Sequence, residues 1–158
     1  MGLPQAVATA SALRECLARE VERARGEREH LKNLDAPALL QGAETRAEFN
    51  ATAARLQRQL ADQLTEVATE HDLSQVTLEA LAGFAPSDAS ALSKAFAEIR
   101  SLAAALAEID QLNRAVAERA LACVESYMHA LSLAPQAYDR RGLNLSALRV
   151  RTTHSLRA

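Results

Sequence analysis

Apolar residues recur at steps of three, four or seven along most of the chain, which is the spacing of one face of an α-helix. The first such stretch covers residues 5–34, and charged residues of alternating sign lie on its other face, as is typical of a solvent-exposed surface. Asp35 is a good N-cap and Pro37 is tolerated only in a first turn, so a second helix is predicted over residues 36–70. The short connection fits either a hairpin or a kinked, nearly continuous rod.

Two further helices are predicted after residue 70. Ser74 is the expected cap of a short helix over residues 75–82, which Gly83 would end. Ser87 is the expected cap of a long helix over residues 88–133, whose apolar positions lie about 3.5 residues apart, as in a coiled coil. At 1.5 Å per residue, this helix would be roughly 65 Å long, which a compact globule of this size would not hold.

The pattern therefore predicts an all-α fold. We expect an elongated antiparallel helical bundle, or coiled coil, of three long helices and one short helix over residues 1–134. Composition agrees, because Ala and Leu dominate while only 3% of residues are aromatic and only five are Gly, which argues against a strand-rich fold. Residues 135–158 contain spaced leucines without a helical or strand pattern, and we expect a flexible tail that becomes ordered on binding.

Charge is distributed unevenly around a formal net charge of −2. From Asp139 to the end of the chain the balance is +4, which leaves −6 for residues 1–138. The basic residues of the tail are spread out and are not interleaved with aromatic residues, so nucleic-acid binding is only weakly indicated and is not predicted. These basic residues are Arg140, Arg141, Arg149, Arg151 and Arg157.

The sequence contains few motifs that could form a catalytic or metal-binding site. Glu27 and His30 form one E-x-x-H motif, whereas di-iron bundles need two such motifs, so no metal site is expected. Phosphate-binding glycine loops and nucleophile motifs are missing, so we expect no enzyme activity, no cofactor and no small-molecule substrate. Cys16 and Cys123 predict free thiols in a reducing compartment, and the short apolar runs predict no membrane insertion, so a cytoplasmic location is expected.

Several features follow one another in an order known from one family. A Glu-rich first helix ends near residues 29–32, and Asp35 with Leu39-Leu40 follows. Asn113 lies in the middle of the last long helix, and a Tyr-x-x-x-Gly element begins at Tyr138 after the helix stop. In this order the features resemble the FlgN family of flagellar export chaperones over most of residues 10–142, with Arg46 where that family usually has Lys.

The resemblance implies a cytoplasmic chaperone that binds the C-terminal helices of hook-associated junction proteins before secretion. Such a chaperone keeps these clients unassembled and brings them to the cytoplasmic domain of a membrane protein, the export gate. It also implies that Asn113 occupies a family position in the helix, and that Tyr138 contacts the export gate. Tyr127 fits the apolar stripe of its helix and is expected to pack, whereas Tyr138 lies beyond Pro135 and is expected to be exposed.

Client binding is predicted at the apolar residues that the bundle can least easily bury, because they lie where the partner helices end. These residues are Val116, Leu131, Leu133, Leu143, Leu145 and Leu148. A structural or self-associating coiled coil without a client fits the long apolar seam equally well. The sequence is also compatible with either a monomer or a dimer as the free protein. A helical nucleic-acid adaptor is a third alternative, which a salt-dependent gel shift would reveal.

Overall fold

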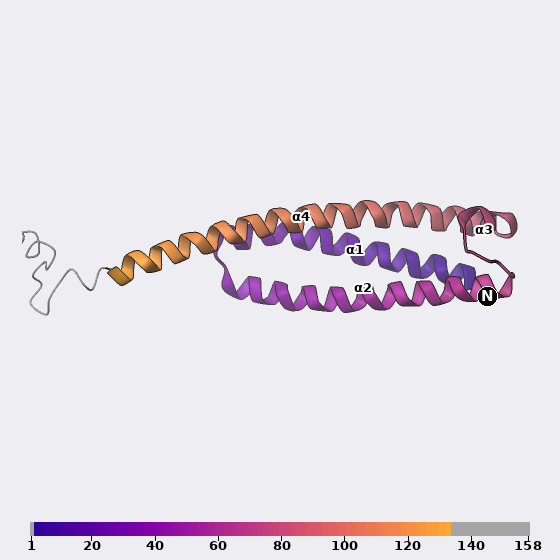
Figure 1. Ribbon diagram of the computed structural model, residues 1–158, viewed down its shortest axis with the longest axis horizontal. Coiled ribbons are helices and arrows are strands. Elements are labelled where there is room, and N and C mark those ends of the chain that lie inside the picture. The colour runs from indigo at the N-terminus through magenta and orange to yellow at the C-terminus, as the bar shows by residue number, and fades with distance from the viewer. Residues whose placement is uncertain (1, 134–158) are drawn as a thin grey trace, which may run out of the picture. The chain divides into compact units, whose positions relative to one another are not determined.

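The computed structural model describes residues 2–133, which form four helices (Figure 1). They are α1 (Gly2–Asn33), α2 (Ala36–Glu70), α3 (Leu78–Phe84) and α4 (Pro86–Leu133). The described residues contain no strand, so the predicted all-α fold is confirmed. The chain divides into two units, Met1–Val116 and Ala117–Ala158.

A tight hairpin joins α1 to α2. Leu34 turns the chain with a left-handed φ of 53°, and the Asp35 carboxylate accepts a hydrogen bond of 3.2 Å from the backbone N–H of Ala38. At the other end of the pair, a Cβ on Gly2 would lie only 2.8 Å from a methyl carbon of Val67, so glycine allows the start of α1 to approach the end of α2. Of the two predicted arrangements, the hairpin is therefore the one that forms.

The core of the first unit comes from α1, α2, α3 and the first part of α4. The start of α1 and the start of α4 share one apolar cluster, and the middle of α1 packs with a later segment of α4. Hence α1 and α4 are parallel, and α2 is antiparallel to both (Figure 1). This up–down–up arrangement confirms the predicted bundle. One cluster contains Leu3, Ala6, Ala10, Leu60, Val67, Leu81, Ala89, Leu92 and Ala95, and the other contains Leu13, Cys16, Leu17, Val21, Ala24, Leu56, Leu106 and Ile109.

The short helix and its neighbour begin at other caps than predicted. Thr77, not Ser74, caps α3, and its hydroxyl accepts a hydrogen bond of 3.2 Å from the N–H of Ala80. Gly83 lies within α3, which continues to Phe84. Ser87 is not a cap either, because α4 already begins at Pro86, whose fixed φ suits a first helical residue.

Candidate functional site

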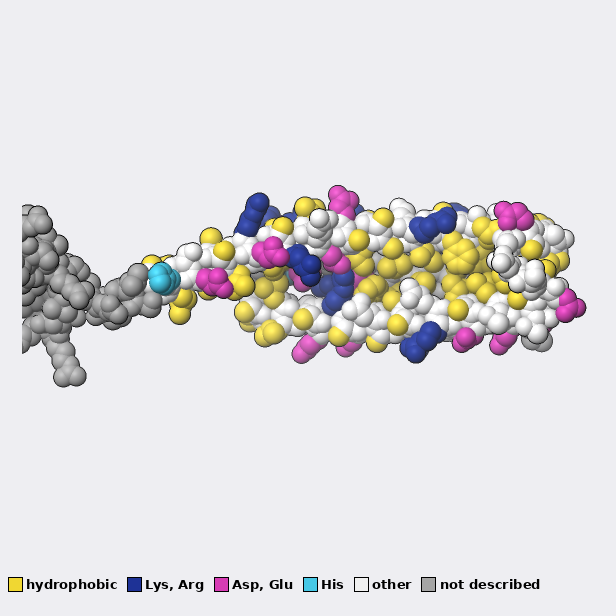
Figure 2. Space-filling view, viewed as in Figure 1, with side chains coloured by type: hydrophobic (Ala, Val, Ile, Leu, Met, Phe, Trp, Pro, Cys, Tyr) yellow, Lys and Arg dark blue, Asp and Glu magenta, His cyan; other side chains and the backbone are white. Residues whose placement is uncertain are grey.

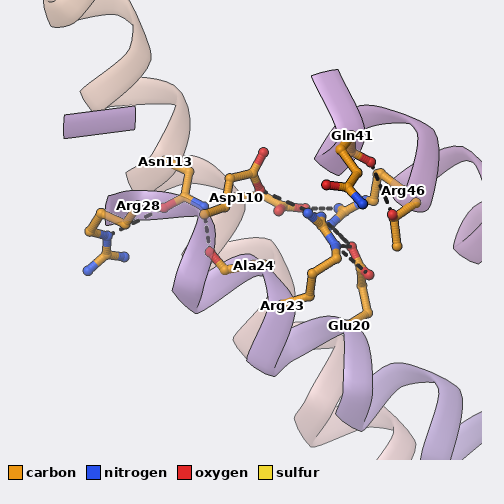
Figure 3. Close-up of polar contacts among 10 residues, drawn as sticks. Glu20, Arg23, Ala24, Arg28, Gln41, Arg46, Asp110 and Asn113 are labelled. Carbon is orange, nitrogen blue, oxygen red and sulfur yellow. Dashed lines mark hydrogen bonds and ion pairs between the residues drawn. The ribbon is translucent and has the colours of Figure 1, made fainter. Parts of the chain in front are cut away.

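A layer of charged side chains crosses the core of the first unit (Figure 3). Glu20 of α1 is only 3% exposed, and its carboxylate accepts hydrogen bonds of 2.7–3.1 Å from Arg23, one turn further along α1. Arg46 of α2 donates a hydrogen bond of 2.7 Å to Glu20 from one side of its guanidinium and a second one to Asp110 of α4 from the other. The guanidinium of Arg46 thus joins all three long helices.

The ion pairs keep this layer charged. Burial works to raise the pKa of Glu20, but the hydrogen bonds and positive charges of Arg23 and Arg46 outweigh it and hold that pKa below its usual 4.5. The hydrogen bond to Glu20 raises the pKa of Arg23. Burial works to lower the pKa of Arg46, yet Asp110 and Glu20 raise it overall. Charges of both signs are therefore matched inside the bundle.

Asn113 lies beside this layer on α4. Its amide group is buried, donates a hydrogen bond of 2.7 Å to the carbonyl oxygen of Ala24, and accepts one of 3.4 Å from Arg28. The contact fixes α4 against α1 at one register, because a shifted α4 would leave the buried amide unpaired. The residue that matches the family pattern thus has a structural contact. It is also the last buried residue of α4 within the described part of the chain.

The histidine and glutamate of the E-x-x-H motif have separate partners. Glu27 pairs with Arg23 at 3.6 Å, and His30 lies 3.5 Å from the carboxylate of Asp35. Within residues 2–133 no three His, Cys, Asp or Glu side chains gather closely enough to hold a metal ion.

Beyond Asn113, α4 carries an exposed apolar face, which we call the open face. Its five large side chains are 41–67% exposed and share one side of the helix, because four of them recur at steps of three or four and Tyr127 lies three positions after Val124. Figure 2 shows hydrophobic side chains at the surface along this part of the helix. All five belong to the second unit. The open face consists of Leu121, Val124, Tyr127, Met128 and Leu131.

The structure describes the side chains of two predicted client-binding residues. Val116 is half-buried at the end of the first unit, and Leu131 is part of the open face. Leu133 is the last residue of α4, and its side chain lies outside the described part of the chain. Leu143, Leu145, Leu148 and Tyr138 lie outside the described residues.

Tyr127 corrects one expectation. It continues the apolar stripe of α4, as predicted, but it is the most exposed of the five side chains at 67% rather than a packed one. The periodic pattern that identified its face carries no information on whether another helix covers it. None of the charged residues of the buried layer was predicted either.

No described helix is apolar over a stretch long enough to span a bilayer. In a comparison with known families, a family model described as FlgN protein matches residues 1–146. The matched range includes the bundle, its charged layer and the open face. Neither the comparison with curated proteins nor the one with solved structures gave a match.

Proposed function

Because the chain belongs to the FlgN family and has the general role of a flagellar export chaperone, we propose that its clients are hook-associated junction proteins. In this proposal the open face of α4 binds the C-terminal amphipathic helix of a client in the cytoplasm. The chaperone keeps the client unassembled until it reaches the export gate.

The exposure of the open face supports this proposal most directly. Large contiguous apolar patches are rare on the surfaces of soluble proteins and mark sites of interaction. Leu121, Met128 and Leu131 recur with the spacing that lets one helix bind the apolar side of another. A client helix bound there would cover its own apolar side, which is the side it needs for assembly.

Apolar residues that precede and follow the open face in the sequence extend the proposed site. Val116, Leu133, Leu143, Leu145 and Leu148 would add apolar contacts along the client. For delivery, Tyr138 would contact the cytoplasmic domain of the export gate, since an exposed tyrosine offers a large apolar ring with one polar end.

Titration with a peptide from the C-terminus of a hook-associated junction protein tests the proposal. Leu121→Ser should weaken binding at least about tenfold, because a leucine buried at an interface contributes roughly 1.5–3 kcal/mol. Leu40→Ser is the matched control, because Leu40 is 70% exposed on α2 and should not affect the affinity. Equal affinity of wild type and Leu121→Ser for the peptide would contradict the proposed site.

Delivery is tested with the cytoplasmic domain of the gate. Tyr138→Ala should bind the client peptide normally but lose about 1–3 kcal/mol of affinity for the gate domain. A variant that binds the gate as well as wild type does but melts several degrees lower would make Tyr138 a packing residue instead.

Self-association through the same face is the second candidate, because an exposed apolar helix face also fits a second copy of the chain. Sedimentation of the free protein distinguishes the two. A dimer that Leu121→Ser dissociates, together with no affinity for the client peptide, would identify a structural coiled-coil protein.

A further inference from the structure

Two acidic side chains lie along one edge of the open face. Glu118 and Glu125 are exposed and lie about 60° and 40° around α4 from Leu121, hence on the same side of the helix. Figure 2 shows acidic side chains beside the hydrophobic ones on this part of α4. The two glutamates are two turns apart, roughly 10 Å along the helix. The chaperone role proposed above uses only the apolar residues and leaves this acidic edge without a purpose.

The open face has the heptad spacing of a coiled coil. The two apolar positions of successive heptads, a and d, are occupied by Leu121, Val124, Met128 and Leu131. In this register Glu118 and Glu125 both occupy the flanking position e, whereas the other flanking position, g, has Ala120 and Tyr127. Charges at positions e and g determine which partner helix binds and in which direction. The open face is therefore acidic on one flank and uncharged on the other.

We propose that Glu118 and Glu125 select a partner helix that carries lysine or arginine beside its own apolar side, with two basic residues seven positions apart. This inference rests on the proposed function, in which the open face binds an amphipathic helix of a client. A basic residue opposite each glutamate forms an ion pair between the helices, whereas an acidic residue there is repelled. The same carboxylates repel the phosphate groups of nucleic acids and of anionic lipids. The acidic flank thus gives the client site a selectivity that its apolar side chains lack.

The heptad register also disfavours a second copy of this chain as the partner. In an antiparallel pair of helices, position e of one helix faces position e of the other, so the glutamates of the two copies would repel each other. In a parallel pair, position e faces position g, where Ala120 and Tyr127 provide no opposite charge. A basic helix of another protein therefore matches the acidic flank, and a second copy does not.

Titration of the full-length protein with two model peptides tests the selection. Both peptides have leucine at positions a and d, and they differ only in having lysine or glutamate at positions e and g. Like charges at these positions keep each peptide from pairing with itself. The lysine peptide should bind roughly tenfold more tightly than the glutamate peptide, because two attractive pairs replace two repulsive ones. Raising the salt concentration should reduce this difference, because salt screens exposed charges.

Paired variants assign the selection to the two glutamates. Glu118→Gln with Glu125→Gln should bind both peptides with affinities within about threefold of each other, since the facing charges are gone. The control is Glu44→Gln with Glu66→Gln, two exposed glutamates of α2, which should keep the preference of wild type for the lysine peptide. A preference that persists unchanged without Glu118 and Glu125 would overturn the proposal.

Failure of this proposal is distinguishable from failure of the proposed function. If wild type binds both peptides equally well and Leu121→Ser weakens binding of both, the open face binds helices without selecting their charge. The acidic flank then has no selective role, and the client site remains. If neither peptide binds, the open face is not a site for helices, and both proposals are overturned.

Discussion

Two segments of α4 have the same spacing of apolar residues and opposite surroundings. Leu92, in the first unit, is completely buried among side chains of α1, α2 and α3, whereas Leu121, in the second, is 59% exposed. Both lie on the apolar side of one helix. Hydrophobic periodicity therefore identifies the face of a helix that avoids water, and it does not identify what covers that face.

The two segments of α4 also differ in what stabilises them. Each fully buried leucine contributes roughly 1.5–3 kcal/mol to folding, so residues 86–113 of α4 are held by the bundle core. The exposed side chains of the open face contribute little in the free protein. Stability in that segment comes from helix propensity, which is strong for its many Ala and Leu residues but gives less protection against local opening.

The largest expected difference in the free energy of unfolding comes from replacing one leucine in each segment by alanine. Leu92→Ala should lower the free energy of unfolding by about 2–5 kcal/mol, because it leaves a cavity among buried neighbours. Leu121→Ala should change it by less than about 0.5 kcal/mol. Urea denaturation followed by circular dichroism measures both. Similar losses in the two variants would mean that the open face is covered in solution.

A smaller effect is expected at the charged layer that lies near the end of the packed segment. Arg46→Ala removes one partner of the buried Glu20 carboxylate and should lower the free energy of unfolding by about 1–3 kcal/mol. Arg55→Ala, at an exposed position of the same helix, is the control and should have almost no effect. Hydrogen exchange should show faster opening at residues 36–55 in the Arg46 variant. Unchanged exchange there would show that Arg46 does not hold this part of α2.

The smallest effect concerns acid. The pKa of Glu20 is lower in the folded protein than its usual 4.5, so the unfolded chain binds the proton more tightly. Glu20 thus stabilises the fold above pH 4.5, and this contribution is lost as the pH falls through the lowered pKa. Denaturation curves between pH 6 and pH 3 should be less pH-dependent for Arg46→Ala than for wild type. An identical pH dependence would rule out Arg46 as a cause of the lowered pKa.

Most of the fold was predictable from the sequence because Asp35, Pro37 and the steps of three and four act locally. The second helix begins and ends where predicted, at Ala36 and Glu70. Its buried face was not predicted correctly in the first half. Ala43 and Ala47 have the spacing of an apolar stripe in this helix but are exposed, whereas Phe49 is partly buried. Alanine suits either side of a helix, so it identifies the core less well than larger residues do.

The charged layer was the main omission from the candidate site. Arg23 belongs to the alternating charges of the first helix, which predict a solvent-exposed face, and the sequence singles out Arg46 only as a departure from the family pattern. A signal did exist, because Arg46 continues the helical spacing of Phe49, Leu56 and Leu60 towards the start of α2. The resemblance identifies Asn113, whereas its neighbour Leu112 has the spacing of the apolar seam and is nevertheless exposed. Where the apolar side of a helix is wide, spacing alone does not show which of two adjacent residues is buried.

The contact between Asn113 and Ala24 can form only after both residues have been synthesised. These two residues are 89 positions apart in the chain. At a translation rate of 5–20 residues per second, Asn113 is made roughly 4–18 s after Ala24. The α1–α2 hairpin can form well before then. The apolar side chains of Leu13, Leu17 and Val21, however, cannot pack with α4 until α4 has been synthesised. A member of a chaperone family for unassembled subunits thus exposes apolar side chains of its own during synthesis at the ribosome.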